Sequence, residues 1–95
     1  MGFSKSPVEM NRTKKFTREE ILMAIREDIA AEIDAINLYL SQANLVDDEF
    51  VKSVLIDIAN EEKVHLGEFL SVLEKLDPEQ VKAIKKGKQE TSELE

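Results

Sequence analysis

The sequence contains no cysteine, only three glycines and only two prolines in 95 residues. The lack of cysteine excludes disulfide bonds and thiolate metal sites, and it is compatible with a reducing compartment. The scarcity of glycine and proline disfavours a loop-rich all-β fold. A composition with 42% apolar and 35% charged residues suits a helical protein instead, and the length allows one domain.

Long apolar runs are also missing. The longest unbroken apolar stretch runs from Ile21 to Ile25, whereas a membrane-spanning helix needs about 20 apolar residues. No signal peptide is visible at the N-terminus. We therefore expect a soluble cytoplasmic protein with no membrane partner.

Positive charge is concentrated at the start of the chain, although the net charge is -7. Residues 1–16 are net positive and are expected to be a disordered basic arm. The remainder is strongly acidic, so it repels nucleic acid, and it attracts cations wherever its charge is focused into a cleft. We expect no nucleic-acid partner.

Local signals predict two long helices. Thr17 and Glu20 have the spacing of a capping box, so a first helix is expected from Thr17 to about Ala43. Asn44 is suited to the left-handed conformation that ends many helices. Acidic residues at 47–49 favour the start of a second helix that runs to about residue 76.

A third, short helix is predicted after the second. Asp77 is a suitable N-cap and Pro78 a suitable first residue. The helix is expected to end near Gly87, with Lys85 and Lys86 in its last turn. We therefore assign residues 17–87 to one helical hairpin domain and residues 88–95 to a flexible tail.

Three residues interrupt the apolar faces of the two long helices: Glu32, Glu62 and His65. Apolar residues otherwise recur every three or four positions. The residues that do so are Ile21, Ile25, Ile29, Ile36, Leu40 and Ala43, then Val51, Leu55, Ile58, Phe69, Leu73 and Leu76. A charge on a buried face is costly unless it is neutralised, and two carboxylates with an imidazole are good ligands for a divalent cation. The pattern predicts part of a metal site.

The hairpin geometry places these residues at similar heights. Two long helices joined by a short turn must be antiparallel, and with the turn centred near residue 46, Glu32 faces residue 60. At a rise of about 1.5 Å per residue, Glu62 is then roughly 3 Å from the level of Glu32, and His65 roughly 7 to 8 Å. All three residues fall in one cross-section.

A second copy of the chain is needed to complete both the core and the site. A chain of this size hides only about 60 to 65% of its surface on folding, and two hairpins can pair into a four-helix bundle. Ferritin-like di-iron bundles use one Glu from each of two helices and a Glu-x-x-His unit from each of the other two. One chain supplies half of that set. We predict an obligate homo-oligomer built on a dimer.

Simpler interpretations remain open for individual residues. His65 could be a core imidazole bonded to Glu32 or Glu62. Glu61, Lys63 and Glu68 lie off the inward stripe and are expected to be plain surface groups. Met23 is expected to be a packing residue and not a sulfur ligand.

The segments EIDAINLY (Glu32 to Tyr39) and EEKVH (Glu61 to His65) resemble the encapsulated ferritins, the ferritin-like cargo of encapsulin nanocompartments. The resemblance covers about residues 17–87. It implies that Glu32 and His65 are terminal iron ligands and that Glu62 bridges two irons across a twofold axis. It also implies that Tyr39 lies near this di-iron site, that the assembly is a ring of five dimers, and that the activity is that of a ferroxidase.

The sequence departs from the family in two places. Some members have acidic residues just before and after the ligand Glu as an outer site for metal uptake, and these positions are Ala31 and Asp34 here. Asp34 is therefore either an outer ligand or a solvated surface carboxylate. The short apolar C-terminal peptide that docks many members to the encapsulin shell protein is not seen. In some archaeal relatives the domain is fused to the shell protein, and residues 88–95 are interpreted as the start of such a linker.

We therefore predict a ferroxidase that oxidises Fe(II) with O2 for iron storage inside a cytoplasmic encapsulin nanocompartment. Carboxylate and imidazole ligands suit Fe(II), and the charged ligands favour the Fe(III) product. Three alternative functions remain open, of which the first two use the same residues and the third uses none of them. They are a non-catalytic assembly stapled by metal, a rubrerythrin-like peroxidase and a metal-free helical interaction module.

Overall fold

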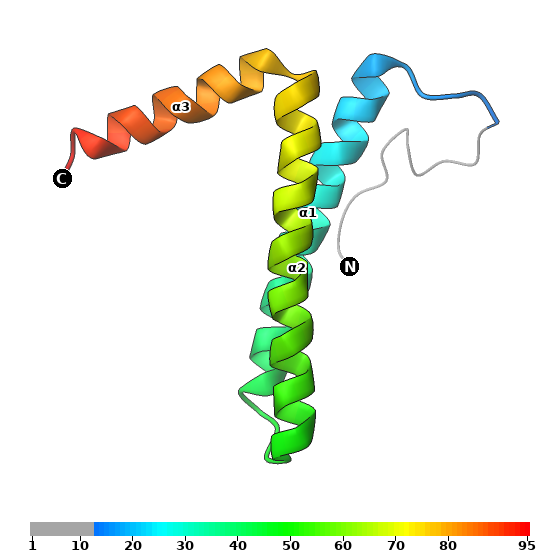
Figure 1. Cartoon of the computed structure of the whole chain (residues 1–95), viewed down its shortest axis with the longest axis vertical. Coiled ribbons are helices and arrows are strands. Elements are labelled where there is room, and N and C mark those ends of the chain that lie inside the picture. The colour runs from blue at the N-terminus through cyan, green and yellow to red at the C-terminus, as the bar shows by residue number, and fades with distance from the viewer. Residues whose placement is uncertain (1–12) are drawn as a thin grey trace.

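The computed structural model describes residues 13–95, which contain three α-helices (Figure 1). The helices are α1 (Arg18–Ala43), α2 (Glu49–Leu76) and α3 (Pro78–Ser92). α1 and α2 lie side by side as an antiparallel hairpin, and α3 leaves the end of α2 at a steep angle (Figure 1). The described part of the chain has no strand, so the predicted all-α hairpin with a third helix is confirmed. Most of the predicted basic arm, residues 1–12, lies outside the described residues.

The capping box at the start of α1 is confirmed. The Thr17 hydroxyl accepts a hydrogen bond from the Glu20 N–H at 3.2 Å, and the Glu20 carboxylate accepts one from the Thr17 N–H at 3.0 Å. The predicted left-handed Asn44 is wrong, because its φ is -69° and its ψ is -18°. The turn is closed by a hydrogen bond of 3.0 Å from the Leu45 N–H to the Gln42 carbonyl, which needs only right-handed backbone.

Asp48 and Asp77 cap the other two helices. The Asp48 carboxylate accepts a hydrogen bond from the Val51 N–H at 3.0 Å, and the Asp77 carboxylate accepts one from the Gln80 N–H at 3.1 Å. Asp77 also ends α2, since its own N–H donates to the Leu73 carbonyl at 2.8 Å. The predicted bounds of α2 are confirmed, and one residue serves as the end of α2 and the beginning of α3.

The predicted end of α3 near Gly87 is wrong, because the helix continues to Ser92. A glycine inside a helix costs only about 1 kcal/mol, and residues 88–90, Lys-Gln-Glu, are good helix formers. An ion pair of 4.0 Å between Lys86 and Glu90 also joins successive turns across Gly87. Lys86 therefore lies inside the helix and not in its last turn, and α3 buries none of its residues.

The hairpin has a small core. The buried apolar residues are Leu22, Ala43, Ala59 and Leu73. Most residues of the two predicted apolar stripes are only half-buried. The first residue of each stripe, Ile21 on α1 and Val51 on α2, is 36% and 41% exposed, respectively. The radius of gyration of 16.8 Å exceeds the roughly 12 Å expected for a compact domain of this length. One copy of the chain therefore leaves much of its apolar stripe uncovered.

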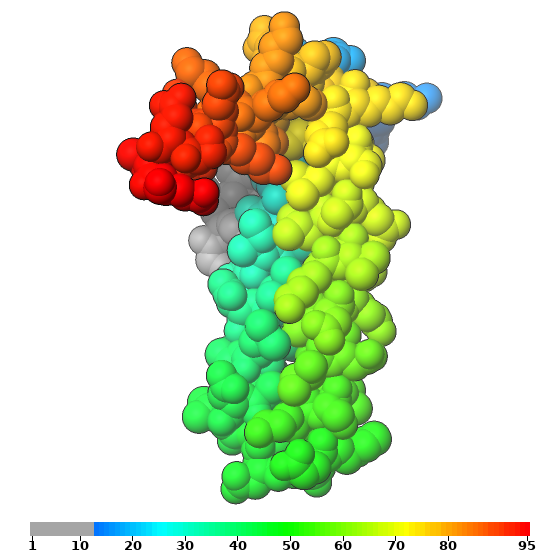
Figure 2. Space-filling model, turned by 60° about the vertical axis from the view of Figure 1, so that its left-hand side comes forward, coloured from blue at the N-terminus to red at the C-terminus, as the bar shows by residue number. Residues whose placement is uncertain are grey.

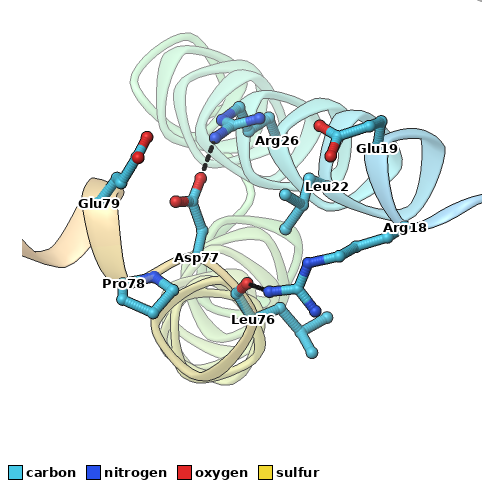
Figure 3. A pocket seen from close by; sticks show the side chains of 8 residues that line it. All are labelled: Arg18, Glu19, Leu22, Arg26, Leu76, Asp77, Pro78 and Glu79. Carbon is cyan, nitrogen blue, oxygen red and sulfur yellow. Dashed lines mark hydrogen bonds and ion pairs between the residues drawn. The ribbon is translucent and has the colours of Figure 1, made fainter.

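Two arginines of α1 hold the corner between α2 and α3 (Figure 3). Arg26 forms an ion pair with Asp77, and its Nε donates to the Gln80 side chain at 3.3 Å. Arg18 donates to the backbone carbonyl of Leu76. These contacts surround a surface hollow of about 540 Å³ and attach the base of α3 to α1. Figure 2 shows α3 overhanging that end of the hairpin.

None of the three helices has the length and apolar character that crossing a membrane requires.

Candidate metal centre

Glu32 from the middle of α1 meets Glu62 and His65 from the middle of α2. One ligand atom of each residue lies within 4.8 Å of the others. The Nδ1 atom of His65 is 3.7 Å from Glu32 Oε2 and 3.5 Å from Glu62 Oε2. The antiparallel register of the hairpin therefore brings together the three residues that interrupt the apolar stripes, as predicted. In the described part of the chain, they are the only such group that could hold a metal ion.

The two carboxylates are more deeply buried than the imidazole. The side chains of Glu32 and Glu62 are 16% and 20% exposed, and that of His65 is 46% exposed. The Oε2 atom of Glu32 is buried and has no hydrogen-bond partner. A buried carboxylate oxygen without a donor is costly, and a bound cation would remove that cost.

The proximity of the two carboxyl groups raises the pKa of Glu32. The largest cause is the hydrogen bond that Glu32 can share with Glu62, followed by burial and by the negative charges of Glu62 and Asp28, while His65 acts in the opposite direction. A hydrogen bond between two carboxyl groups needs a proton on one of them. With both groups ionised, that bond cannot form and the two negative charges repel each other.

The two separations that involve His65 are compatible with ligands of a shared divalent ion. Oxygen and nitrogen ligands lie about 2.0 to 2.2 Å from such a metal, so neighbouring ligand atoms are about 3 to 4 Å apart. The separations of 3.5 and 3.7 Å match that range. No hydrogen bond joins His65 to either carboxylate among the described contacts, and the imidazole is too exposed for a core residue. Together these features make the group a candidate metal site.

A hollow of about 330 Å³ opens beside the site and is lined by Glu32, His65, Glu68 and Phe69. Glu68 is exposed, as a surface group should be, but its place in this wall was not predicted. The available signal was its position three residues after His65, which makes the two side chains neighbours on the helix surface. Because Glu68 lies off the inward apolar stripe, the stripe alone does not indicate this position.

The remaining candidate residues lie apart from this group. Tyr39 is half-buried and about 10 Å further along α1 than Glu32, and it does not line the hollow. Asp34 is exposed and points to a different face from Glu32, because two residues correspond to about 200° of helical rotation. Glu61 and Lys63 are exposed, as expected of surface groups.

Comparisons with known proteins agree on one family. The profile of the Rubrerythrin family matches residues 23–94. The chain is 48% identical over 91 residues to the ferritin-like-encapsulin shell fusion protein of Pyrococcus furiosus, which covers 96% of this chain and 26% of that protein. It is 40% identical over 67 residues to the encapsulin nanocompartment cargo protein EncC of Myxococcus xanthus, which covers 70% of this chain and 52% of that protein.

A solved structure is similar over almost the whole chain. The crystal structure of the encapsulated ferritin domain from Pyrococcus furiosus matches with a TM-score of 0.88 and 48% identity, covering 98% of this chain and 95% of that one. The two curated relatives are longer, and the chain spans about a quarter of one and about half of the other.

Proposed function

We infer that this chain, which belongs to the encapsulated ferritin-like domains of the rubrerythrin and ferritin-like family and has their fold, is a ferroxidase. We propose that its di-iron site is shared between two copies. The observation that carries the proposal is that ligand atoms of Glu32, Glu62 and His65 lie within 4.8 Å of one another. They lie on a face of the hairpin that one chain leaves partly uncovered. Three ligands from one chain are half of the six that a ferritin-like di-iron bundle uses.

Uncovered apolar residues on the same face of α2 as His65 support a dimer. Val54 and Val72 are 40% and 39% exposed, and they lie 11 residues before and 7 residues after His65. These intervals are close to three and two helical turns, so the three side chains share one face of α2. A second hairpin packed on this face would bury both valines and bring its own ligands to the site.

The ligand set suits the oxidation of Fe(II), which enters as the substrate. We assign Glu32 and His65 of each copy as ligands of one iron, and the two Glu62 side chains as bridges between the irons. Two Fe(II) ions lose one electron each, and one O2 takes up both electrons and two protons to become hydrogen peroxide. Anionic carboxylates favour the Fe(III) product. We assign Tyr39 to the surroundings of the irons in the assembled dimer.

The proposed setting follows from the relatives, which are named as a fusion to an encapsulin shell and as an encapsulin cargo. We propose that this domain assembles as a ring of five dimers and works with an encapsulin shell in the cytoplasm, where Fe(III) is stored as mineral. A packed four-helix bundle has no cavity for a mineral, so storage requires an enclosing partner.

Fe(II) oxidation by O2 with single variants tests the assignment. Glu32→Ala, Glu62→Ala and His65→Ala are expected to lower the rate by at least about ten-fold, since even outer-shell changes at metal sites cost that much. Glu61→Ala is the matched control, because Glu61 is exposed and adjacent to a ligand without belonging to the group. Unchanged rates in all three ligand variants would overturn the proposal.

Anomalous scattering at the iron edge, from crystals grown with Fe(II), would locate the metal. Two irons between paired chains are expected. Metal that is bound and holds the dimer, but is not oxidised, would instead support a metal-stapled assembly. The Rubrerythrin profile match favours one further candidate, a peroxidase, which predicts faster turnover with hydrogen peroxide than with O2.

A further inference from the structure

The hairpin has an apolar and acidic tip, residues 45–49, at the end opposite to α3 (Figure 1). Leu45 is 87% exposed, the highest value for a large apolar residue within residues 13–95. Residues 47–49 are Asp-Asp-Glu, and all three are exposed. A single exposed leucine is ordinary on a protein surface, so the tip gains meaning only from a surface that complements it.

A hollow of about 240 Å³ between the end of α2 and α3 has the complementary character. We call it the α2–α3 hollow, and its lining is Glu74, Val81, Ile84, Lys85 and Lys88. Two apolar side chains are thus flanked by two lysines and one glutamate. α3 as a whole carries four lysines and two glutamates, although the chain has a net charge of -7. An apolar hollow on a basic helix matches an apolar tip with acidic neighbours.

The position of the hollow indicates which copy of the chain can fill it. Glu74 lies nine residues after His65, or two and a half helical turns, so it is on the side of α2 opposite to the proposed dimer face. Ile56, nine residues before His65, is on the same opposite side and is 40% exposed. The tip of the same chain is roughly 40 Å away along α2. A tip that fills the hollow therefore belongs to a copy outside the dimer.

We propose that the tip of a chain in one dimer docks into the α2–α3 hollow of a neighbouring dimer. Leu45 then faces the apolar residues of the hollow, and the acidic residues 47–49 face its two lysines. This inference rests on the proposed function, because it takes the dimer as its unit, and it adds the surface by which dimers join. Each dimer has two tips and two hollows, so the contact can repeat, and a repeating contact that closes forms a ring.

A single contact of this kind is expected to be weak. The tip has five residues, whereas a stable interface uses roughly 20 to 30 residues on each side. Two chains joined as a dimer present two tips together, and linked contacts bind more tightly than separate ones. A chain that cannot form the dimer is therefore expected to remain monomeric.

Sedimentation velocity of the full chain tests the proposal. The wild type is expected to form assemblies larger than a dimer, and Leu45→Ser is expected to lose them and to sediment as a dimer. Leu94→Ser is the matched control, because Leu94 is 86% exposed and does not line the hollow. It should sediment like the wild type. Circular dichroism should find the helices retained in both variants, since both leucines are exposed.

Charge reversal tests the pairing of tip and hollow directly. Lys85→Glu with Lys88→Glu should remove the larger assemblies, because like charges across an interface repel. Asp47→Lys with Glu49→Lys should do the same, while Asp48 is kept because it caps α2. The protein with all four substitutions again has opposite charges in contact and should regain the larger assemblies. A purely structural role of either segment would not produce this recovery.

Larger assemblies that persist in Leu45→Ser and in both charge-reversed proteins would overturn the inference. A wild type that sediments only as a dimer would also overturn it, while leaving the proposed function intact. Failure of the proposed function looks different, since the wild type would then be monomeric and would not oxidise Fe(II). The Leu45→Ser dimer should oxidise Fe(II) at the wild-type rate, because the proposed di-iron site needs only one dimer.

Discussion

Arg26 of α1 forms an ion pair with Asp77, the residue at which α2 ends and α3 begins (Figure 3). The Asp77 side chain is only 14% exposed, whereas that of Arg26 is 45% exposed. Asp77 therefore has two tasks, since it caps α3 through the Gln80 N–H and also holds the corner of the chain against α1. This contact links α1 to the corner from which α3 leaves the hairpin.

Two substitutions of Asp77 separate these tasks. Asp77→Ala removes the cap and the ion pair, and it is expected to lower the free energy of unfolding by about 1 to 2 kcal/mol. Asp77→Asn keeps a good capping side chain and removes only the charge, so it should cost less than about 1 kcal/mol. Urea unfolding monitored by circular dichroism measures both values. An equal loss in the two variants would show that the ion pair, and not the cap, stabilises the corner.

A lysine in the uncovered face of α2 should prevent dimer formation. Val72→Lys would place a charge in the proposed interface, two helical turns from His65 on the same face, and burying an unpaired charge there is prohibitive. Val64→Lys is the matched control, since Val64 is rotated by about 100° from His65 and so lies off the face that His65 shares with Val54 and Val72. Analytical ultracentrifugation should find monomers for Val72→Lys, with its helices retained, and dimers or larger assemblies for Val64→Lys. Dimers in both variants would place the interface elsewhere.

The raised pKa of Glu32 predicts a pH-dependent penalty in the metal-free protein. Between the ordinary value of 4.5 and the raised folded value, the folded state holds a proton that the unfolded state has lost. Stability contributed by this group is therefore lost as pH rises through that window. Glu32→Gln removes the ionised carboxylate and should make the metal-free protein more stable than wild type at pH 7. The advantage should disappear below about pH 4.5.

Thermal unfolding in a chelating buffer, at a series of pH values, checks this sign. Glu61→Gln, an exposed neighbour of the site, should show no comparable gain. A Glu32→Gln protein that is less stable than wild type at pH 7 would contradict the prediction, because it would mean that the ionised Glu32 is stabilised by a protein partner.

Bound metal should offset the loss of stability that the ionised Glu32 carboxylate causes in the metal-free protein. A ligand that binds only the folded state stabilises it, by about 2.7 kcal/mol at roughly 100 times its dissociation constant. Co(II) is therefore expected to raise the melting temperature of the wild type, and to do so more at pH 7 than at pH 5, since the carboxylates must be ionised to bind it. His65→Ala should lose most of the increase. An equal increase in His65→Ala would place the bound metal outside the candidate site.

Gly87 offers a test of the length of α3. It lies inside the helix, and within residues 13–95 no atom outside its own helical turn comes within 4 Å of a Cβ at this position. Gly87→Ala should therefore increase helix content and stabilise α3 by up to about 1 kcal/mol. Circular dichroism measures the gain in helix. No gain, together with rapid amide exchange beyond residue 87, would indicate that the helix ends at the glycine.

The helix boundaries were predictable where a local signal set them. Thr17 and Glu20 satisfy each other's backbone groups, and Asp77 caps α3, so these boundaries depend on residues that are close in sequence. The end of α3 was not predictable from Gly87 alone, because a glycine lowers helix stability without preventing the helix. Asn44 similarly tolerates a left-handed conformation, but the turn between α1 and α2 does not require one.

The proximity of Glu32, Glu62 and His65 was predictable because two periodic stripes in an antiparallel hairpin leave little freedom of register. The place of Glu68 was not, because it depends on how the hollow between α1 and α2 opens beside Phe69. Neither spacing nor charge encodes that opening. The same limit applies to Tyr39, whose proposed role depends on a second chain.

Ala59 is the most deeply buried residue of the hairpin, at 0% exposure, and it lies one turn before Glu62. Its side chain is a single methyl group, so the backbones of α1 and α2 can come close at this level. A larger side chain there would push the helices apart and lengthen the gap between Glu32 and the pair on α2. The small size of Ala59 therefore limits the distance between the ligand on α1 and the two ligands on α2. A substitution at this position could change the metal preference of the site without altering any ligand.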